Sequence, residues 1–230
     1  MELPVVMPRD RGCTECELHE GIKSVYIPTV MYPESNADSN NIVIFIGQNP
    51  GFNEDQKDEP FIGRSGEMVK QAYIGGCNIQ DKAVIYLTNG VRCHTINNAT
   101  PKPRHYRTCM PHTSGDIHYL INEWYNQEEP GKFIVVTLGA PATSSFYKDI
   151  LEEKRVSLNE AFNRNGNTYM WDVFKKEFHV FSTYHPAAVM RNNNYINAVE
   201  SHMQLVSDCL DGTMAEPSEP DIVPTRSPRR

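Results

Sequence analysis

Several common features are missing from this sequence of 230 residues. No run approaches the roughly 20 apolar residues that a membrane-spanning helix needs. The N-terminus carries charges and prolines where a secretory signal would carry an apolar stretch. Positive charge is also scarce, because 22 Lys and Arg face 29 Asp and Glu, giving a formal net charge of -7. We therefore expect a cytoplasmic protein, and phosphate binding would need a local basic patch rather than an overall positive charge.

The sequence is long enough for one sizeable domain, and we find no internal repeat in it. Apolar residues make up 39% and charged residues 22% of the chain, which is typical of a globular protein with a core. After residue 210 the composition changes to Pro, Ser, Glu and Arg with few large apolar residues. We predict a single domain over residues 1–210, beginning with a cysteine-containing segment, and a disordered tail over 211–230.

Four apolar runs rich in β-formers stand out, at residues 41–46, 83–88, 133–138 and 178–183. Sequence typical of helices follows or separates them, at 66–74, 112–125, 140–151 and 195–210. Apolar strands that alternate with helices predict an α/β fold, in which a parallel sheet is covered on both faces. The segment 152–177 contains the turn residues Asn-Arg-Asn-Gly-Asn and resembles a hairpin before the last strand.

Polar residues and a glycine follow the ends of these four predicted strands. They are Gln48, Asn89, Gly139 and His185. Ligands of parallel α/β sheets bind beyond the carboxyl ends of the strands. The sequence therefore predicts a binding site at this edge of the sheet.

Six cysteines in a reducing compartment indicate a metal site or free thiols rather than disulfides. Cys13 and Cys16 form a C-x-x-C motif, and Cys93 and Cys109 follow the second strand with fifteen residues between them. Four thiolates complete the ligand set of a zinc ion or a 4Fe-4S cluster. The wide second pair favours iron-sulfur over zinc, although Cys93 and Cys109 can also be interpreted as ordinary buried thiols.

Six sequence blocks in order resemble one known family. They are C-T-E-C-E-L, I-G-Q-N-P-G-F-N-E-D with E-P-F-I-G-R-S-G, Y-L-T-N-G-V-R-C, a second cysteine after N-N-A-T-P, T-L-G-A-P-A, and S-T-Y-H-P-A-A-V-M-R. Together they span about residues 13–200 and resemble the iron-sulfur uracil-DNA glycosylases called family four. The match in order across six blocks is far more specific than any one of them.

The resemblance implies a three-layer α/β/α sandwich around a four-stranded, mainly parallel sheet. It also implies a structural 4Fe-4S cluster, a monomeric protein whose partner is uracil-containing DNA, and an action in base excision repair in the cytoplasm or at the nucleoid. The cluster ligands would be Cys13, Cys16, Cys93 and Cys109.

Three side chains match the base pocket of that family. Phe61 corresponds to the aromatic ring that stacks on a flipped uracil, although a lone Phe is usually a core residue. Asn89 corresponds to the amide that binds the base edge, where it would complement O4 and N3-H of uracil but not cytosine; it could also simply cap a strand. His185 corresponds to the histidine that donates to O2 of the departing base and lowers the barrier.

Gln48 and Asn49 depart from the family pattern. The family typically has G-E-A-P-G where this sequence has G-Q-N-P-G. Gln48 lines the predicted base pocket but has no carboxylate, so it cannot act as a general base. The segment is similar to the loop of mismatch-specific and single-strand-selective uracil glycosylases, in which the asparagine orients the attacking water. Asn49 is therefore our catalytic candidate together with His185.

Other residues of these blocks are expected to contact the DNA backbone or to fix loops. We predict backbone contacts for Gly51, Arg64, Ser65 and Arg191. Glu54 and Asp55 match a family acid pair, and we favour a loop-fixing or solvated role for them. A basic rim is predicted at Lys102, Arg104 and Arg107, although a charged loop is often only solvated.

The sequence thus predicts a monofunctional DNA N-glycosylase, a hydrolase that removes uracil and leaves an abasic site. No lysine occupies a matched position, so Schiff-base chemistry is not expected. Two alternatives stay open. One is an enzyme of the same fold that acts on another modified or deaminated base, since Gln48 and Asn49 are unusual. The other is a catalytically silent iron-sulfur protein that binds DNA.

Overall fold

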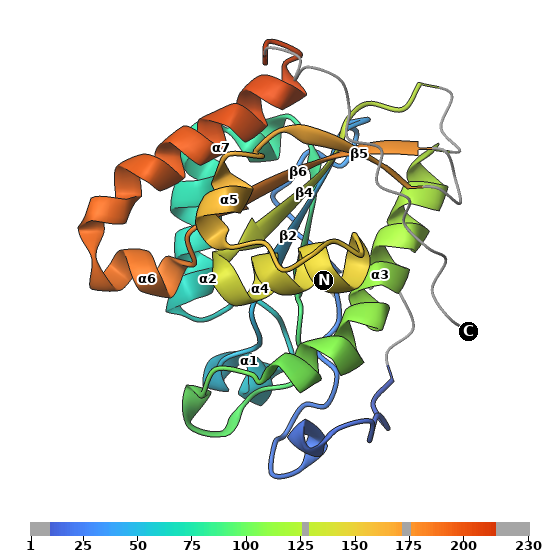
Figure 1. Ribbon diagram of the computed structural model, residues 1–230, viewed down its shortest axis with the longest axis vertical. Coiled ribbons are helices and arrows are strands. Elements are labelled where there is room, and N and C mark those ends of the chain that lie inside the picture. Colours follow the sequence, from blue (N-terminus) through green and yellow to red (C-terminus); the bar gives the residue numbers. More distant parts are fainter. Residues whose placement is uncertain (1–9, 126–128, 172–175, 215–230) are drawn as a thin grey trace.

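A six-stranded sheet forms the centre of the protein in a computed structural model that describes residues 10–125, 129–171 and 176–214 (Figure 1). The strand order is β1-β3-β2-β4-β6-β5. The strands are β1 (Val30–Met31), β2 (Ile42–Gly47), β3 (Val84–Asn89), β4 (Phe133–Leu138), β5 (Asn167–Trp171) and β6 (Lys176–Thr183).

The four inner strands pair in parallel, which confirms the predicted α/β sheet. The predicted total of four strands is wrong, because β1 and β5 add one antiparallel strand at each edge. β1 has only two residues, too few to produce an alternating pattern. β5 lies within the segment expected to form a hairpin, and it does pair antiparallel with β6.

Helices cover both faces of the sheet and give the predicted three-layer sandwich (Figure 1). One layer contains α3, α4, the π-helical turn η6 and α5. The other contains α2, the π-helical turn η2 and α7. Their bounds, with the remaining short helices, are η1 (Glu17–His19), α1 (Phe52–Lys57), α2 (Arg64–Met68), η2 (Val69–Ile74), η3 (Gly75–Cys77), η4 (Ile79–Asp81), η5 (Ile96–Asn98), α3 (Pro103–Tyr125), α4 (Gly139–Ser145), η6 (Phe146–Ile150), α5 (Leu158–Phe162), α6 (Pro186–Arg191), η7 (Asn193–Tyr195) and α7 (Ile196–Leu210).

The predicted helices all exist, but one begins earlier than expected. α3 starts at Pro103 rather than at residue 112. Proline fits the first turn of a helix because its missing N–H group needs no partner there. Pro111 also lies inside α3, and an interior proline usually signals a helix end, so the sequence pointed to a later start. The short helices α1 and α6 were not predicted, because six residues carry too little periodicity.

Alternate residues of the inner strands supply the two halves of the core. In β2, Ile42, Ile44 and Ile46 pack on the layer that contains α3, whereas Val43 and Phe45 pack on the layer that contains α7. Both faces of β2 are buried, as expected for a strand in the middle of a covered parallel sheet. This burial fixes the register of the strands, and with it the position of the residues that follow each strand end.

A buried ion pair lies beside the end of β3. Nη2 of Arg92 is 2.6 Å from Oδ2 of Asp116, and both side chains are almost fully inaccessible. Thr29 and Thr113 accept further hydrogen bonds from the guanidinium, at 2.9 and 3.1 Å. The ring of Tyr26 lies 5.6 Å from the guanidinium carbon. This network joins the N-terminal segment, the loop after β3 and helix α3.

Within the described ranges, no helix combines the length and apolar character that a bilayer crossing requires. The predicted tail falls mostly outside these ranges, since description ends at residue 214.

Replacing Asp116 with Ala should lower the free energy of unfolding by about 3–5 kcal/mol, because it leaves the buried Arg92 without a counter-ion. Urea unfolding followed by circular dichroism measures the change. Asp211→Ala is the control, because it removes the partly exposed Lys82–Asp211 pair and should cost under about 1 kcal/mol. Equal effects of the two substitutions would contradict the stabilising role of the buried pair.

Candidate active site

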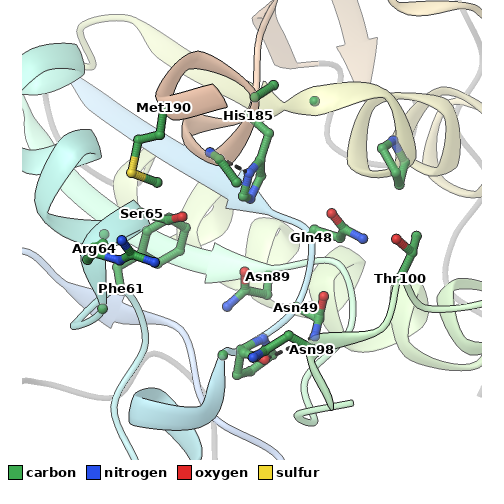
Figure 2. A pocket seen from close by; sticks show the side chains of 18 of the residues that line it. Gln48, Asn49, Phe61, Arg64, Ser65, Asn89, Asn98, Thr100, His185 and Met190 are labelled. Carbon is green, nitrogen blue, oxygen red and sulfur yellow. Dashed lines mark hydrogen bonds between the residues drawn. The ribbon is translucent and has the colours of Figure 1, made fainter. Parts of the chain in front are cut away.

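A pocket of about 900 Å³ opens at the carboxyl edge of the parallel strands (Figure 2). The loops after β2, β3, β4 and β6 contribute to it, together with α2 and α6. It brings together every residue predicted to bind a base, to catalyse or to contact the DNA backbone, which are Gln48, Asn49, Gly51, Phe61, Arg64, Ser65, Asn89, His185 and Arg191. Their individual roles stay predictions.

The floor of the pocket is built around Gly47, the last residue of β2. A Cβ atom at Gly47 would lie 2.4 Å from Oδ1 of Asn89 and 2.8 Å from Cζ of Phe61. Asn89 is the register partner of Gly47 in β3, so its amide stands directly beside the glycine. Only glycine leaves room for the amide and the ring to meet at this point.

Phe61 is held in an uncommon backbone conformation, with φ of 57°. A bulky residue rarely adopts positive φ unless its surroundings impose it. Gly66 of α2 packs against the Phe61 backbone so closely that a Cβ there would overlap the carbonyl oxygen. The Phe61 ring is 8% exposed and lines the pocket. The loop therefore presents one face of a nearly buried ring to the cavity.

Asn89 is buried, with 6% of its surface exposed. Its backbone carbonyl accepts a hydrogen bond from Thr113 of α3 at 3.3 Å, which ties the strand end to the helix. Its side-chain amide borders the cavity in Figure 2. A buried amide that faces a cavity supplies one donor and one acceptor to a ligand.

His185 caps α6, and its contacts define its tautomer. Nδ1 accepts the N–H group of Ala187 at 3.1 Å, so the proton of the neutral ring resides on Nε2. Burial and, secondarily, the positive charge of Arg191 lower the pKa of His185 from 6.5 to about 4. The imidazole is therefore neutral at pH 7 and offers Nε2–H as a donor.

Gly139, at the end of β4, lets the backbone pass close behind His185. Its φ is +81°, a conformation that favours glycine, and a Cβ there would lie 2.7 Å from Cβ of His185. The glycine noted at this strand end thus lines the pocket and also leaves room for the histidine.

Asn49 is oriented by the protein around it. Its Nδ2 donates to the carbonyl of Pro50 at 3.0 Å and to Oγ1 of Thr95 at 3.1 Å. A carbonyl can only accept, so the amide nitrogen must face Pro50. The remaining oxygen, Oδ1, is turned towards the cavity (Figure 2). This places a hydrogen-bond acceptor at the pocket wall.

Two neighbours of Asn49 were missed by the sequence analysis. Thr95 donates its hydroxyl proton to the carbonyl of Ala99 at 2.5 Å, so it receives the Asn49 amide as an acceptor. His94 lies 3.1 Å through Nδ1 from the same Pro50 carbonyl. Both residues directly follow Cys93, which could have drawn attention to them. A histidine or threonine in a loop indicates no role by itself, and only the contacts with Asn49 and Pro50 show one.

The neighbouring acids hold loops together. The carboxylate of Glu54 accepts the N–H group of Gly63 at 2.8 Å, which links the start of α1 to the start of α2. Asp55 accepts the N–H groups of Lys23 and Ser24 at 3.0 and 2.8 Å. These are the contacts of loop-fixing groups. Gln48 carries no charge and is half-buried at the pocket wall.

The rim of the pocket combines basic and apolar side chains. Arg64 and Arg191 are exposed and line it, and Phe52 and Met190 are 58% and 42% exposed beside them. The loop predicted to form a basic rim contributes Asn98 and Thr100 to the pocket. None of its three basic residues, Lys102, Arg104 and Arg107, is among the residues that line the pocket, and Arg104 pairs with Glu17.

The four predicted cysteine ligands lie near one another. Besides burial, electrostatic repulsion from Cys16 and Cys13 contributes to a raised pKa of Cys93, and repulsion from Cys93 and Cys16 contributes to a raised pKa of Cys109. Burial raises the pKa of Cys93 to about 11 and that of Cys109 to about 12. Backbone N–H groups point at the sulfurs, from Glu15 to Cys13, from Tyr26 to Cys93 and from Arg92 to Cys109. Such donors stabilise thiolates that bind metal.

Comparison with known proteins agrees with this arrangement. Residues 33–204 match the Uracil DNA glycosylase superfamily. A type-4 uracil-DNA glycosylase of Thermotoga maritima is 30% identical over 84% of this chain and 85% of its own length. The type-4 uracil-DNA glycosylase of Saccharolobus solfataricus is 28% identical over 90% of this chain and 86% of its own length. That of Sulfurisphaera tokodaii is 26% identical over 86% of this chain and 80% of its own length. The chain therefore belongs to the uracil DNA glycosylase superfamily.

Proposed function

We propose that this protein is a monofunctional uracil-DNA glycosylase, which hydrolyses the N-glycosidic bond of a uracil flipped out of DNA. One observation carries the proposal. A stacking ring, a base-edge amide, a neutral imidazole donor and an oriented amide acceptor, from Phe61, Asn89, His185 and Asn49, line a single pocket. The similarity to type-4 uracil-DNA glycosylases supports it. Such a repair enzyme would work in the cytoplasm or at the nucleoid.

Recognition of the base would use the pocket floor. A nucleotide must leave the helical stack before an enzyme can reach its glycosidic bond. The ring of Phe61 would stack on the extruded base, and the amide of Asn89 would pair with O4 and N3-H of uracil. Cytosine presents a donor and an acceptor at the corresponding atoms in reverse order, so it would leave this buried amide mismatched.

Departure of the base would depend on His185. Negative charge grows on uracil as the glycosidic bond lengthens, and a preorganised donor to O2 stabilises it. The Nε2–H group of a neutral imidazole fits this role, since Nδ1 is already occupied by Ala187. No proton has to move before the bond breaks.

The attacking water would be held by Asn49. Gln48 cannot remove a proton from water at neutral pH. A dissociative reaction forms an oxocarbenium-like sugar, which needs only a weak nucleophile that is well placed. Oδ1 of Asn49 can accept a hydrogen bond from that water and hold the lone pair of the water towards the sugar.

The DNA backbone would run along the rim. Arg64, Ser65 and Arg191 line the mouth of the pocket, and Gly51 allows close approach of the chain. No lysine is among the described residues that line the pocket, which supports hydrolysis without a Schiff base.

We also propose that Cys13, Cys16, Cys93 and Cys109 hold a 4Fe-4S cluster with a structural role. A tetrahedral zinc site, with bonds of about 2.3 Å, would place its sulfurs about 3.8 Å apart. Among the described residues, the metal-ligand group whose atoms all lie within 4.8 Å contains Cys13 but not the other three cysteines. A cluster of four irons separates its thiolates further than a single ion does, so the arrangement favours the cluster.

Release of uracil from a single-lesion oligonucleotide tests the proposed activity. The His185→Ala variant should lose about 10²–10³-fold in single-turnover rate, because it removes one donor to the departing base. His118→Ala is the matched control, since His118 lies on α3 away from the pocket and its replacement should leave the rate unchanged.

Release of another base but not uracil would overturn the substrate assignment, and DNA binding without release of any base would overturn the activity. A covalent adduct on borohydride reduction would contradict the hydrolytic mechanism.

The pH profile provides a further check on His185. The pKa of His185 in the folded protein, about 4, lies below the ordinary value of 6.5, so the unfolded chain binds a proton at this residue more readily. The neutral, buried His185 therefore contributes stability above pH 6.5, and this contribution is lost as the pH falls from 6.5 through 4. The wild-type rate should therefore show no His185 titration between about pH 6 and 8. A His185-dependent step near pH 6.5, absent from the His185→Ala variant, would contradict the neutral donor.

Thr95→Val should lower the single-turnover rate about three- to tenfold with little change in KM, because it removes one hydrogen bond that orients Asn49. Thr95→Ser keeps the hydroxyl and should restore the rate. Asn49→Ala should reduce the rate further, and adding Thr95→Val to it should have no additional effect. Independent, additive losses would show that Thr95 does not act through Asn49.

Cys109→Ala should abolish incorporation of iron and the visible absorbance of the purified protein, because a ligand of the cluster is lost. Metal analysis after anaerobic purification measures this. Cys77→Ser is the control, since Cys77 packs in the opposite layer of the fold and should retain iron. Zinc in place of iron in the wild-type protein would overturn the cluster assignment.

A further inference from the structure

His112 lies beside the four cysteines without a role in the site described so far. It stands on α3 three residues after Cys109, so the two side chains share one face of the helix. Its Nε2 atom is buried and has no hydrogen-bond partner among the described residues. A buried polar atom left without a partner costs about 1–3 kcal/mol. The unpaired Nε2 atom of His112 therefore indicates a hydrogen-bond partner among the groups at Cys13, Cys16, Cys93 and Cys109, which we call the cysteine centre.

The surroundings of the His112 ring identify the candidate acceptors. The metal-ligand atoms of Cys13, Glu15 and His112 all lie within 4.8 Å of one another. Nε2 of His112 is 3.5 Å from Oε2 of Glu15, and the Tyr26 ring meets the imidazole edge-on at 4.9 Å. The Tyr26 contact fixes the plane of the imidazole. The nearby carboxylate favours the tautomer with a proton on Nε2.

Cys13 is the acceptor that binding of a cluster would create. As a neutral thiol its sulfur accepts hydrogen bonds only weakly, but as a metal-bound thiolate it becomes a strong, negatively charged acceptor. The N–H group of Glu15 already donates to the same sulfur from the backbone. Glu15 thus lies between the two residues: its main chain contacts Cys13, and its carboxylate is 3.5 Å from Nε2 of His112 without forming a hydrogen bond.

We propose that Nε2–H of His112 donates a hydrogen bond to the metal-bound thiolate of Cys13, and that this bond helps to retain the cluster and raises its reduction potential. The inference rests on the proposed 4Fe-4S cluster. A donor to a ligating sulfur withdraws electron density and favours the more negative, reduced state. The reduction potential serves here as a measure of the hydrogen bond. A change in this potential does not imply that the protein transfers electrons.

A different use of the same three residues would be a small metal site made by Cys13, Glu15 and His112 alone. Three facts favour the donor role over this site. Cys13 shares its surroundings with Cys16 and Cys93, Glu15 is largely exposed, and the Cys93 and Cys109 sulfurs already receive backbone donors. The thiolate centre therefore extends beyond the three residues.

His112→Phe, purified anaerobically as the holoprotein, tests the bond, because it keeps the aromatic contact with Tyr26 but removes the donor. Its reduction potential should shift to more negative values, and its affinity for the cluster should fall by about 10- to 100-fold, as for loss of other outer partners of metal ligands. Redox titration and the decay of visible absorbance with a chelator measure these changes. His112→Gln places an amide donor near the original Nε2 position and should restore much of both properties.

His118→Phe is the matched control, since it makes the same substitution on α3 away from the cysteines and should leave the potential and the retention unchanged. Wild-type values of both properties in His112→Phe would overturn the proposal. If that variant assembles no cluster, His112→Gln decides, and failure of the glutamine variant to retain the cluster would also overturn it. Zinc in the wild-type protein would instead refute the cluster itself, which separates the two failures.

Discussion

The parallel pairing of β2, β3, β4 and β6 is the constraint on which the site depends. It places the ends of four strands at one edge, so residues separated by more than a hundred positions in sequence meet in one pocket. The pairing of Gly47 with Asn89 shows the precision required, since a shift by one residue would point the amide into a core layer. The covered faces of the sheet enforce this register, because the central strands β2 and β4 are buried on both sides along their whole length. The burial of apolar side chains that stabilises the fold thus also sets the geometry of the pocket.

The sequence predicted what is repeated along the chain and missed what depends on single contacts. Apolar runs bounded by turn signals were sufficient for the four inner strands, and their polar ends were sufficient to place Gln48, Asn89 and His185 at one edge. The two-residue strand β1 and the six-residue helices α1 and α6 were too short for a pattern. The role of Thr95 follows only from its hydrogen bond to Asn49 in the structure, because a threonine in a loop has no distinguishing sequence feature.

The pocket achieves polarity without an ionised group at its centre. Asn49, Asn89 and His185 are all neutral at pH 7. Hydrogen bonds orient the side chains of Asn49 and His185, and Thr113 holds the backbone carbonyl of Asn89. The acids nearby, Glu54 and Asp55, use their charge to bind backbone N–H groups of loops. Fixed neutral dipoles suit a reaction in which charge develops late, because they need no reorganisation when the bond breaks. Exchange of the family's acid for Gln48 is consistent with this chemistry.

The cysteine centre and the base pocket share one structural support. Arg92 directly precedes Cys93, and its guanidinium binds Asp116 and Thr113 of α3. Thr113 in turn donates to the backbone carbonyl of Asn89, and the turn of α3 just before Thr113 carries Cys109 and His112. If the four cysteines hold the proposed cluster, its loss would loosen the loop after β3 from both ends, since Cys93 lies at its start and Cys109 in the helix that follows. The same loop carries Thr95, which orients Asn49. A cluster at these cysteines would therefore influence catalysis without touching the substrate, because the loop that it anchors holds Thr95 against the amide of Asn49.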